Sequence, residues 1–132
     1  MSTGQKIGLV VLLLALALVG CSGRSSLKRG WVETNGLSHL DIRYNYFEGI
    51  ERRSFRAAEG QDINLEADLQ VEDGALTVRL IDPSGELIWE ESYSEDAEFS
   101  LAVEAEREGR YKLEMEGESA EGGFEIDWEV RD

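Results

Sequence analysis

The strongest constraint on the fold is an alternation of apolar and polar residues that begins at Leu40 and recurs to the end of the chain. A period of two is typical of β-strands that bury one face. The alternating runs cover residues 40–46, 63–71, 76–80, 99–105, 111–115 and 124–130, with weaker runs at 50–58 and 87–93. Residues 101–107 also have helical propensity, but the alternation from Phe99 favours a strand. The pattern therefore predicts about eight strands and little helix.

Turn-forming residues separate these runs. They are Glu72-Asp73-Gly74, Asp82-Pro83-Ser84-Gly85, Glu108-Gly109 and Glu121-Gly122-Gly123. In the second group, proline presets φ and aspartate can accept a hydrogen bond from a later residue, so this group predicts a tight hairpin. We expect residues 37–132 to form a single all-β domain, an antiparallel β-sandwich or jelly roll.

Composition excludes several classes of protein. The chain has 13 Lys and Arg against 28 Asp and Glu, a formal net charge of −15, which excludes ordinary nucleic-acid binding. A single Cys and a single His exclude a disulfide framework and a thiolate zinc site. Hydrophobic residues make up 42% of the chain, enough to build a core. We therefore expect a folded, acidic domain.

The N-terminus reads as an export signal over residues 1–20, with Lys6 before an apolar run at 7–19 that is too short to span a membrane comfortably. Leu18-Val19-Gly20-Cys21 resembles the lipobox of bacterial lipoproteins. The resemblance implies cleavage between Gly20 and Cys21, a diacylglyceryl group on the Cys21 thiol, and an N-acyl group in many cases. The lipid would hold the protein on the extracytoplasmic face of a cell membrane or outer membrane. An ordinary secretory signal and an uncleaved anchor are the alternatives.

Residues 21–36 are polar and contain glycine and serine, so they predict a flexible tether between the lipid and the domain. Charge is divided unevenly along the mature chain. Basic residues predominate in residues 21–56, whereas acidic residues strongly predominate in residues 57–132. Basic residues near the lipid could rest on anionic head groups while the acidic body is repelled from them. The simpler alternative is an acidic coat that keeps the domain soluble.

The stretch from Ser54 to Val130 resembles small extracellular β-sandwich modules, namely bacterial pre-peptidase C-terminal domains and GOLD domains. The resemblance rests on residues 76–85, which end in Asp-Pro-Ser-Gly, and on Phe99 and the later Gly-Arg-Tyr-Lys-Leu of residues 109–113. The paired cysteines and membrane-spanning tail of typical GOLD proteins are absent from the sequence. The resemblance implies a non-catalytic binding or spacer module and transfers no site residue.

Calcium is a candidate ligand because carboxylate oxygens are abundant. The candidate residues are Glu66, Asp68, Glu72, Asp73 and Asp82, although the spacing of an EF-hand is absent and strand alternation would separate alternate acids. A solvated acidic edge is the alternative. Catalysis by Ser38 and His39 is disfavoured, because adjacent strand residues point to opposite faces. A carboxylate-dependent hydrolase would need a cleft with a raised carboxyl pKa.

Aromatic side chains offer a second kind of site. Trp31 lies in the predicted tether and Phe47 is out of phase with Tyr46, so both are candidates for exposed rings that contact a glycan or peptide. Tyr111 and Trp128 are in phase with the core. From the sequence we expect an exported, lipid-anchored envelope protein that acts as a non-enzymatic binding or structural module, with an envelope protein or glycan as partner.

Overall fold

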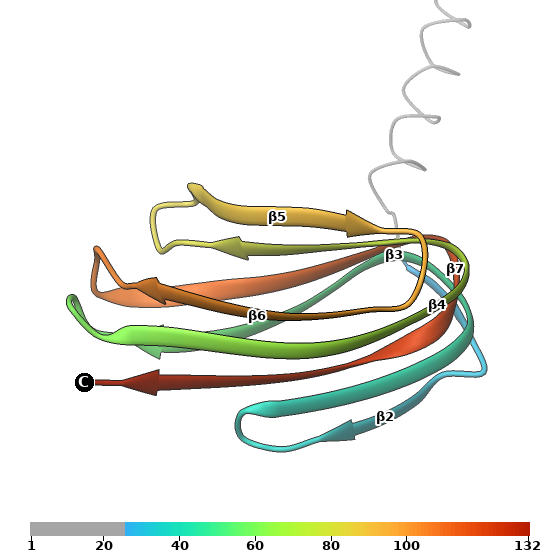
Figure 1. The fold of residues 1–132 in the computed structure, drawn as a ribbon, viewed down its shortest axis with the longest axis horizontal. Helices are drawn as coiled ribbons and strands as arrows, with labels where there is room; N and C mark the ends of the chain where they lie inside the picture. The colour runs from blue at the N-terminus through green and yellow to red at the C-terminus, as the bar shows by residue number, and fades with distance from the viewer. Residues whose placement is uncertain (1–25) are drawn as a thin grey trace, which may run out of the picture.

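A computed structural model describes residues 26–132; the predicted signal peptide, Gly20 and Cys21 lie outside these residues. The described chain is all-β, as predicted, and forms one antiparallel sheet of seven strands (Figure 1). The strands are β1 (Leu27–Arg29), β2 (Val32–Asn35), β3 (His39–Ala57), β4 (Asp62–Ile81), β5 (Leu87–Tyr93), β6 (Ala97–Glu104) and β7 (Gly109–Arg131). Within residues 26–132, no helix is long and apolar enough to cross a membrane.

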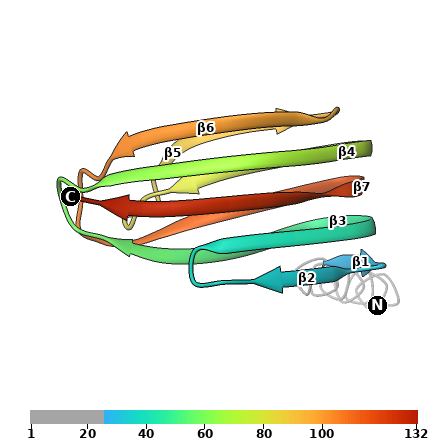
Figure 2. The same cartoon turned by 60° about the horizontal axis from the view of Figure 1, so that its bottom comes forward.

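Three long strands, β3, β4 and β7, bend together and build both layers of a sandwich (Figures 1 and 2). One layer, here the β6 layer, contains β2, residues 39–44 of β3, 122–131 of β7, 62–71 of β4, and β6. The other, here the β5 layer, contains residues 49–57 of β3, 109–117 of β7, 75–81 of β4, and β5. We call the bend between the layers the corner.

Irregular pairing and glycine make the corner possible. The register of β3 against β7 shifts between Tyr44 and Gly49, and that of β4 against β7 shifts between Val71 and Ala75. Such bulges increase the local bend of a strand without ending its pairing. Gly122 has a φ of 136°, and a Cβ there would collide with the carbonyl oxygen of Gln70. The close approach of β7 to β4 therefore requires glycine at this position.

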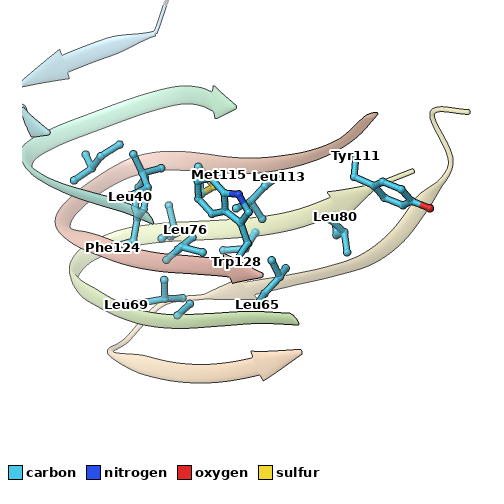
Figure 3. Close-up of a cluster of buried hydrophobic side chains, with 14 of the residues drawn as sticks. Leu40, Leu65, Leu69, Leu76, Leu80, Tyr111, Leu113, Met115, Phe124 and Trp128 are labelled. Carbon is cyan, nitrogen blue, oxygen red and sulfur yellow. The ribbon is translucent and has the colours of Figure 1, made fainter. Parts of the chain in front are cut away.

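The core lies between the two layers (Figure 3). Leu65 and Leu69 of the β6 layer and Leu80 and Leu113 of the β5 layer are at most 1% exposed. Tyr111 and Trp128 are also buried, as the sequence predicts. Burial of each large apolar side chain contributes about 1.5–3 kcal/mol, so this core can hold the sandwich together without a disulfide.

Two of the expected turns are corners rather than chain reversals. Asp82–Gly85 closes the β4–β5 hairpin as predicted, with the Gly85 amide donating to the Asp82 carbonyl at 3.0 Å. Residues 72–74 and 121–123, in contrast, lie inside the continuous strands β4 and β7. Glycine and acidic residues suit a strand corner as well as a hairpin, and strand pairing on both sides of each group keeps the chain running forward. Eight expected runs therefore merge into fewer, longer strands.

The expected flexible tether differs from the structure over residues 27–35. These residues form β1 and β2, which both pair with β3. Between them, the Trp31 ring stacks on Tyr44 with ring centroids 5.6 Å apart. Strands of three and four residues are too short to show an alternation in the sequence, and their pairing is stabilised by contacts with residues far along the chain.

The two lateral edges of the sandwich are closed differently. At the β2 edge, Arg53 of the β5 layer bridges to Glu33 of the β6 layer at 2.7 Å and also contacts Glu51 of its own strand at 3.0 Å. At the opposite edge, Phe99 of β6 packs against Trp89 and Tyr93 of β5, with ring centroids 4.9 and 6.0 Å apart. This aromatic contact covers only part of the β5–β6 edge.

Candidate functional site

The outer face of the β6 layer is a grid of acidic side chains on four neighbouring strands, β3, β7, β4 and β6. Figure 2 shows the order of these strands. Outward-facing residues follow the strand alternation, so the same pattern that builds the core places polar residues side by side outside. Asp68 lies opposite Glu98 on one side and Glu125 on the other, and Glu66 lies opposite Asp127. The acids of this face are Asp41, Asp62, Glu66, Asp68, Glu98, Glu104, Glu125, Asp127 and Glu129.

Two shallow hollows run across this face. The first, of about 480 Å³, is lined mainly by Glu66, Asp68, Glu98, Glu125 and Asp127. The second, of about 580 Å³, shares Glu66 and Asp127 with the first and extends towards Ser38, Asn64, Trp128, Glu129 and Arg131. The lining of the first hollow is mostly carboxylates, so a ligand that fills it must carry positive charge; the second hollow also has the guanidinium of Arg131 in its lining.

His39 stands at one side of the grid and forms a square with three carboxylates. His39 and Asp41 are two residues apart on β3, and their partners on β7 are Asp127 and Glu125. Nδ1 of His39 lies 2.6 Å from Oδ1 of Asp127. One ligand atom each from His39, Asp41 and Glu125 lies within 4.8 Å of the others. We call these four residues the His39 square.

The electrostatics of the His39 square favour positive charge. The hydrogen bond to Asp127 is the main cause that raises the pKa of His39, and the nearby charges of Asp127, Glu125 and Asp41 act in the same direction. The ring and its neighbours are half-buried or exposed, so an ion can reach them from solvent. Imidazole nitrogen and carboxylate oxygen are ordinary ligands of divalent metal ions. A ligating His whose other ring nitrogen is held by a carboxylate is also a common arrangement.

Acidic residues on the outer face of the β5 layer are paired with arginine instead. Nε of Arg52 lies 2.6 Å from Glu114, and Arg79 reaches Glu116 at 2.6 Å and also contacts Glu90. The carboxylates of Glu90, Glu114 and Glu116 are therefore already paired with arginine. Glu66, Asp68 and Glu98 of the β6 layer have no salt bridge among the described residues.

The five calcium candidates of the sequence do not meet at one point. Glu66 and Asp68 lie on the acidic grid, whereas Glu72 and Asp73 lie at the corner of β4. Asp82 organises the β4–β5 turn: its Oδ1 accepts from the Ser84 hydroxyl at 2.6 Å and from the Ser84 and Glu86 amides. These hydrogen bonds, with that of the Ser84 hydroxyl foremost, lower the pKa of Asp82.

Neither aromatic candidate is a freely exposed ring. Phe47 is fully buried, so its predicted exposure is wrong; its ring lies 5.1 Å from Trp31 and 5.3 Å from Tyr44. The irregular pairing after Tyr44 returns Phe47 to the inner face, which strict alternation could not foresee. Trp31 is half-buried in the same cluster. Within residues 26–132 the exposed large hydrophobic side chains are all aliphatic.

Sequence reasoning missed Asp41, Glu125 and Asp127 as site residues, and considered His39 only for catalysis. The available signal was the pair of alternations His39-x-Asp41 and Glu125-x-Asp127, each of which places two ligand-type side chains on one strand face. Which strand lies next to which could not be read from these patterns. The antiparallel pairing of β3 with β7 brings the two pairs together across 88 residues of sequence.

No family model matches the chain, and no curated protein matches its sequence. Solved structures resemble it in fold. The pre-peptidase C-terminal domain of a Bacillus anthracis collagenase is 14% identical, with a TM-score of 0.47 over 80% of this chain and 88% of that one. A carbohydrate-binding module of a Cellvibrio mixtus lichenase, solved with cellotriose, is 10% identical, with a TM-score of 0.42 over 81% of this chain and 94% of that one.

The enzymatically active domain of tailspike protein 4 of bacteriophage CBA120 is 13% identical, with a TM-score of 0.47. The match covers 80% of this chain but only 19% of that one, so the chain spans about a fifth of the length of the tailspike domain.

Proposed function

We propose that this protein is a lipid-anchored, non-enzymatic binding module of a bacterial cell envelope, and that its acidic face binds a divalent metal ion at the His39 square. The observation that carries the proposal is the convergence of ligand atoms from His39, Asp41 and Glu125 within 4.8 Å, with Asp127 hydrogen-bonded to the imidazole. A bound ion would add neutralising charge to Glu125, which has no salt bridge among the described residues, and to Asp41, whose arginine contact, with Nε of Arg43, is long at 3.9 Å.

The residue types favour a transition-metal ion over calcium. Calcium takes six to eight oxygen ligands, whereas zinc and manganese accept a mixture of imidazole and carboxylate. Asp127 would hold Nδ1 of His39 and leave Nε2 available as a ligand atom, with Asp41 and Glu125 as the carboxylate ligands. Solvent would complete the coordination.

The lipid anchor rests on the sequence from Leu18 to Cys21. β1 begins at Leu27, six residues after Cys21, and six residues span at most about 20 Å. A lipid on Cys21 would therefore keep the corner end of the sandwich close to the membrane. Lys28 and Arg29 lie in β1 and would add attraction to anionic head groups.

A hydrolytic function has less support. An acid catalyst needs a carboxyl group whose pKa is raised. Where carboxyl pKa values in the described residues shift, at Glu33, Asp82 and Glu129, hydrogen bonds lower them. A glycan site built on exposed aromatic rings has less support as well, because no aromatic side chain in residues 26–132 is among the exposed large hydrophobic residues.

Calorimetric titration of the detergent-solubilised mature protein with zinc tests the metal site. We expect one ion to bind, and the His39→Ala and Asp41→Asn variants to bind at least about tenfold more weakly. Glu98→Gln removes an acid from the same face outside the square and should leave the affinity within about twofold. Equal weakening by all three variants would show attraction by net charge alone, and absence of zinc binding would refute the site.

Membrane fractionation with mass spectrometry tests the anchor separately. The wild-type protein should sediment with membranes and carry a diacylglyceryl mass on an N-terminal Cys21, whereas Cys21→Ser should remain unprocessed or lose the lipid. An unmodified thiol on a soluble wild-type protein would contradict the anchor without affecting the metal result.

A further inference from the structure

A groove lies at the open end of the β5–β6 edge, opposite the corner. Its apolar wall consists of Leu87 and Ile88 of β5, Val103 of β6 and the buried ring of Tyr111 of β7. The volume is about 500 Å³. The aromatic contact of Trp89, Tyr93 and Phe99 closes the rest of this edge, so the groove is the stretch that it leaves uncovered.

A bulge in β5 creates the apolar wall. Leu80 pairs with Trp89 and Ile81 pairs with Leu87, so Ile88 is an extra residue in the ladder. In a regular strand two adjacent side chains point to opposite faces, whereas a bulge turns them towards the same side. Leu87 and Ile88 are 49% and 39% exposed and both line the groove. They are two of the few large hydrophobic side chains that the described chain exposes.

Carboxylates surround the apolar wall. Asp82, Glu86, Glu104 and Glu106 complete the lining, and no basic side chain is among the lining residues. One lining carboxylate, Asp82, is paired: its Oδ2 lies 3.3 Å from Nε of Arg107. An occupant that covers Leu87 and Ile88 therefore meets strong negative charge around them. Charge complementarity requires that this occupant be basic as well as apolar.

The groove also lies between two sheet edges. Among the described strands, β5 is the last of its layer and β6 is the last of the other layer, and each pairs only with β4. Unpaired edge strands offer backbone groups to an added extended chain, while pockets beside them accept alternate side chains. This geometry favours an extended peptide over a compact ligand.

We propose that the β5–β6 groove binds an extended basic segment of a partner protein, with an aliphatic side chain seated against Leu87, Ile88 and Val103 and with Lys or Arg side chains facing Glu86, Glu104 and Glu106. The groove is separate from the metal site, which lies on the outer face of the β6 layer towards β3. It is at the end of the sandwich away from β1 (Figure 2), where a partner can approach.

The probe is a fluorescein-labelled peptide of five Lys-Leu repeats, measured by anisotropy against the full mature protein at physiological ionic strength. One comparison peptide replaces each Leu with Ser and keeps the charge, and another replaces each Lys with Glu and keeps the apolar side chains. We expect only the Lys-Leu peptide to bind, with amide NMR shifts concentrated at Leu87, Ile88 and Val103. Equal binding of the Lys-Ser peptide would overturn the proposal, because charge alone would then suffice.

Variants locate the binding independently. Ile88→Ser should weaken binding about tenfold through lost apolar contact, and Glu104→Gln with Glu106→Gln should weaken it by a similar factor. The controls are Leu37→Ser, which removes a fully exposed leucine between β2 and β3, and Glu118→Gln with Glu121→Gln at the corner. The controls should bind within about twofold of wild type. Equal loss in the corner variant, or no binding of the Lys-Leu peptide to wild type, would contradict the inference.

Discussion

The two outer faces of the sandwich are built from the same three strands but use charge in opposite ways. On the β5 layer, Arg52 and Arg79 neutralise Glu90, Glu114 and Glu116 through contacts within the sheet. On the β6 layer, Glu66 and Asp68 of β4 lie opposite acids of β7, Asp127 and Glu125. The chain runs continuously from one face to the other through the corner, so the difference lies in side chains and not in backbone architecture.

This contrast separates two roles for acidic residues. A carboxylate that accepts a charge-assisted hydrogen bond from arginine is part of the folded structure. Like charges placed directly opposite each other on a sheet are destabilising, by a few tenths to about 1 kcal/mol for each pair. The acids of the β6 layer therefore cost stability in the free protein. A bound cation would remove that cost.

Both faces belong to a single sheet that passes through the corner. We expect the largest change in stability from a substitution at the corner. Gly122→Ala should lower the free energy of unfolding by about 3 kcal/mol or more, because the new Cβ meets the Gln70 carbonyl oxygen at a φ of 136°. Gly60→Ala is the control, since Gly60 has a positive φ but open space around it. Urea denaturation of both variants measures the difference. Equal losses would mean that close packing at the corner contributes nothing.

Removal of an arginine from the β5 layer has the next largest effect. Arg79→Ala leaves Glu90 and Glu116 without their partner, and we expect the free energy of unfolding to fall by about 1–2 kcal/mol in urea denaturation. Arg56→Ala, at an exposed position of the same layer that forms no ion pair among the described residues, should change it by less than about 0.5 kcal/mol. If Arg79→Ala changes the free energy of unfolding as little as Arg56→Ala does, the ion pairs of this face do not stabilise the fold.

Removal of acids from the β6 layer should have the opposite sign. Glu66→Gln with Asp68→Asn relieves repulsion from Glu98, Glu125 and Asp127, and should raise the free energy of unfolding by about 0.5 kcal/mol at low salt. The gain should shrink as sodium chloride screens the repulsion. Thermal unfolding at two salt concentrations checks both statements. A loss of stability would place these acids in a structural role.

The fold was predictable because burial imposes a regular signal. Leu40, Leu65, Leu80 and Trp128 all appear in alternating runs, and each is in the core. The sequence could not show whether a turn signal marks a bend within a strand or a reversal of the chain, because both use the same residue types. Gly74 and Gly122 lie at bends within strands. The pairing of β1 and β2 was hidden because neither strand is long enough to alternate.

The candidate site was predictable only in part. Glu66 and Asp68 could be recognised as an acidic pair on one strand face, and both lie on the acidic grid. His39 and Asp127 are 88 residues apart, and only the register of β3 against β7 brings them together. The position of Phe47 could not be predicted for a similar reason. Irregular pairing with β7 changes the face on which Phe47 lies, and a bulge leaves no reliable mark in the sequence.

Paramagnetic NMR compares the two faces most directly. Substoichiometric manganese added to the isotope-labelled mature protein should first broaden the amide signals of His39, Asp41 and Glu125. The signals of Glu90, Glu114 and Glu116 should stay sharp, because their carboxylates are already paired with arginine. Broadening of equal extent on both faces would contradict the account, since it would show that the acids of the β6 layer are no more available to a cation than those paired with arginine.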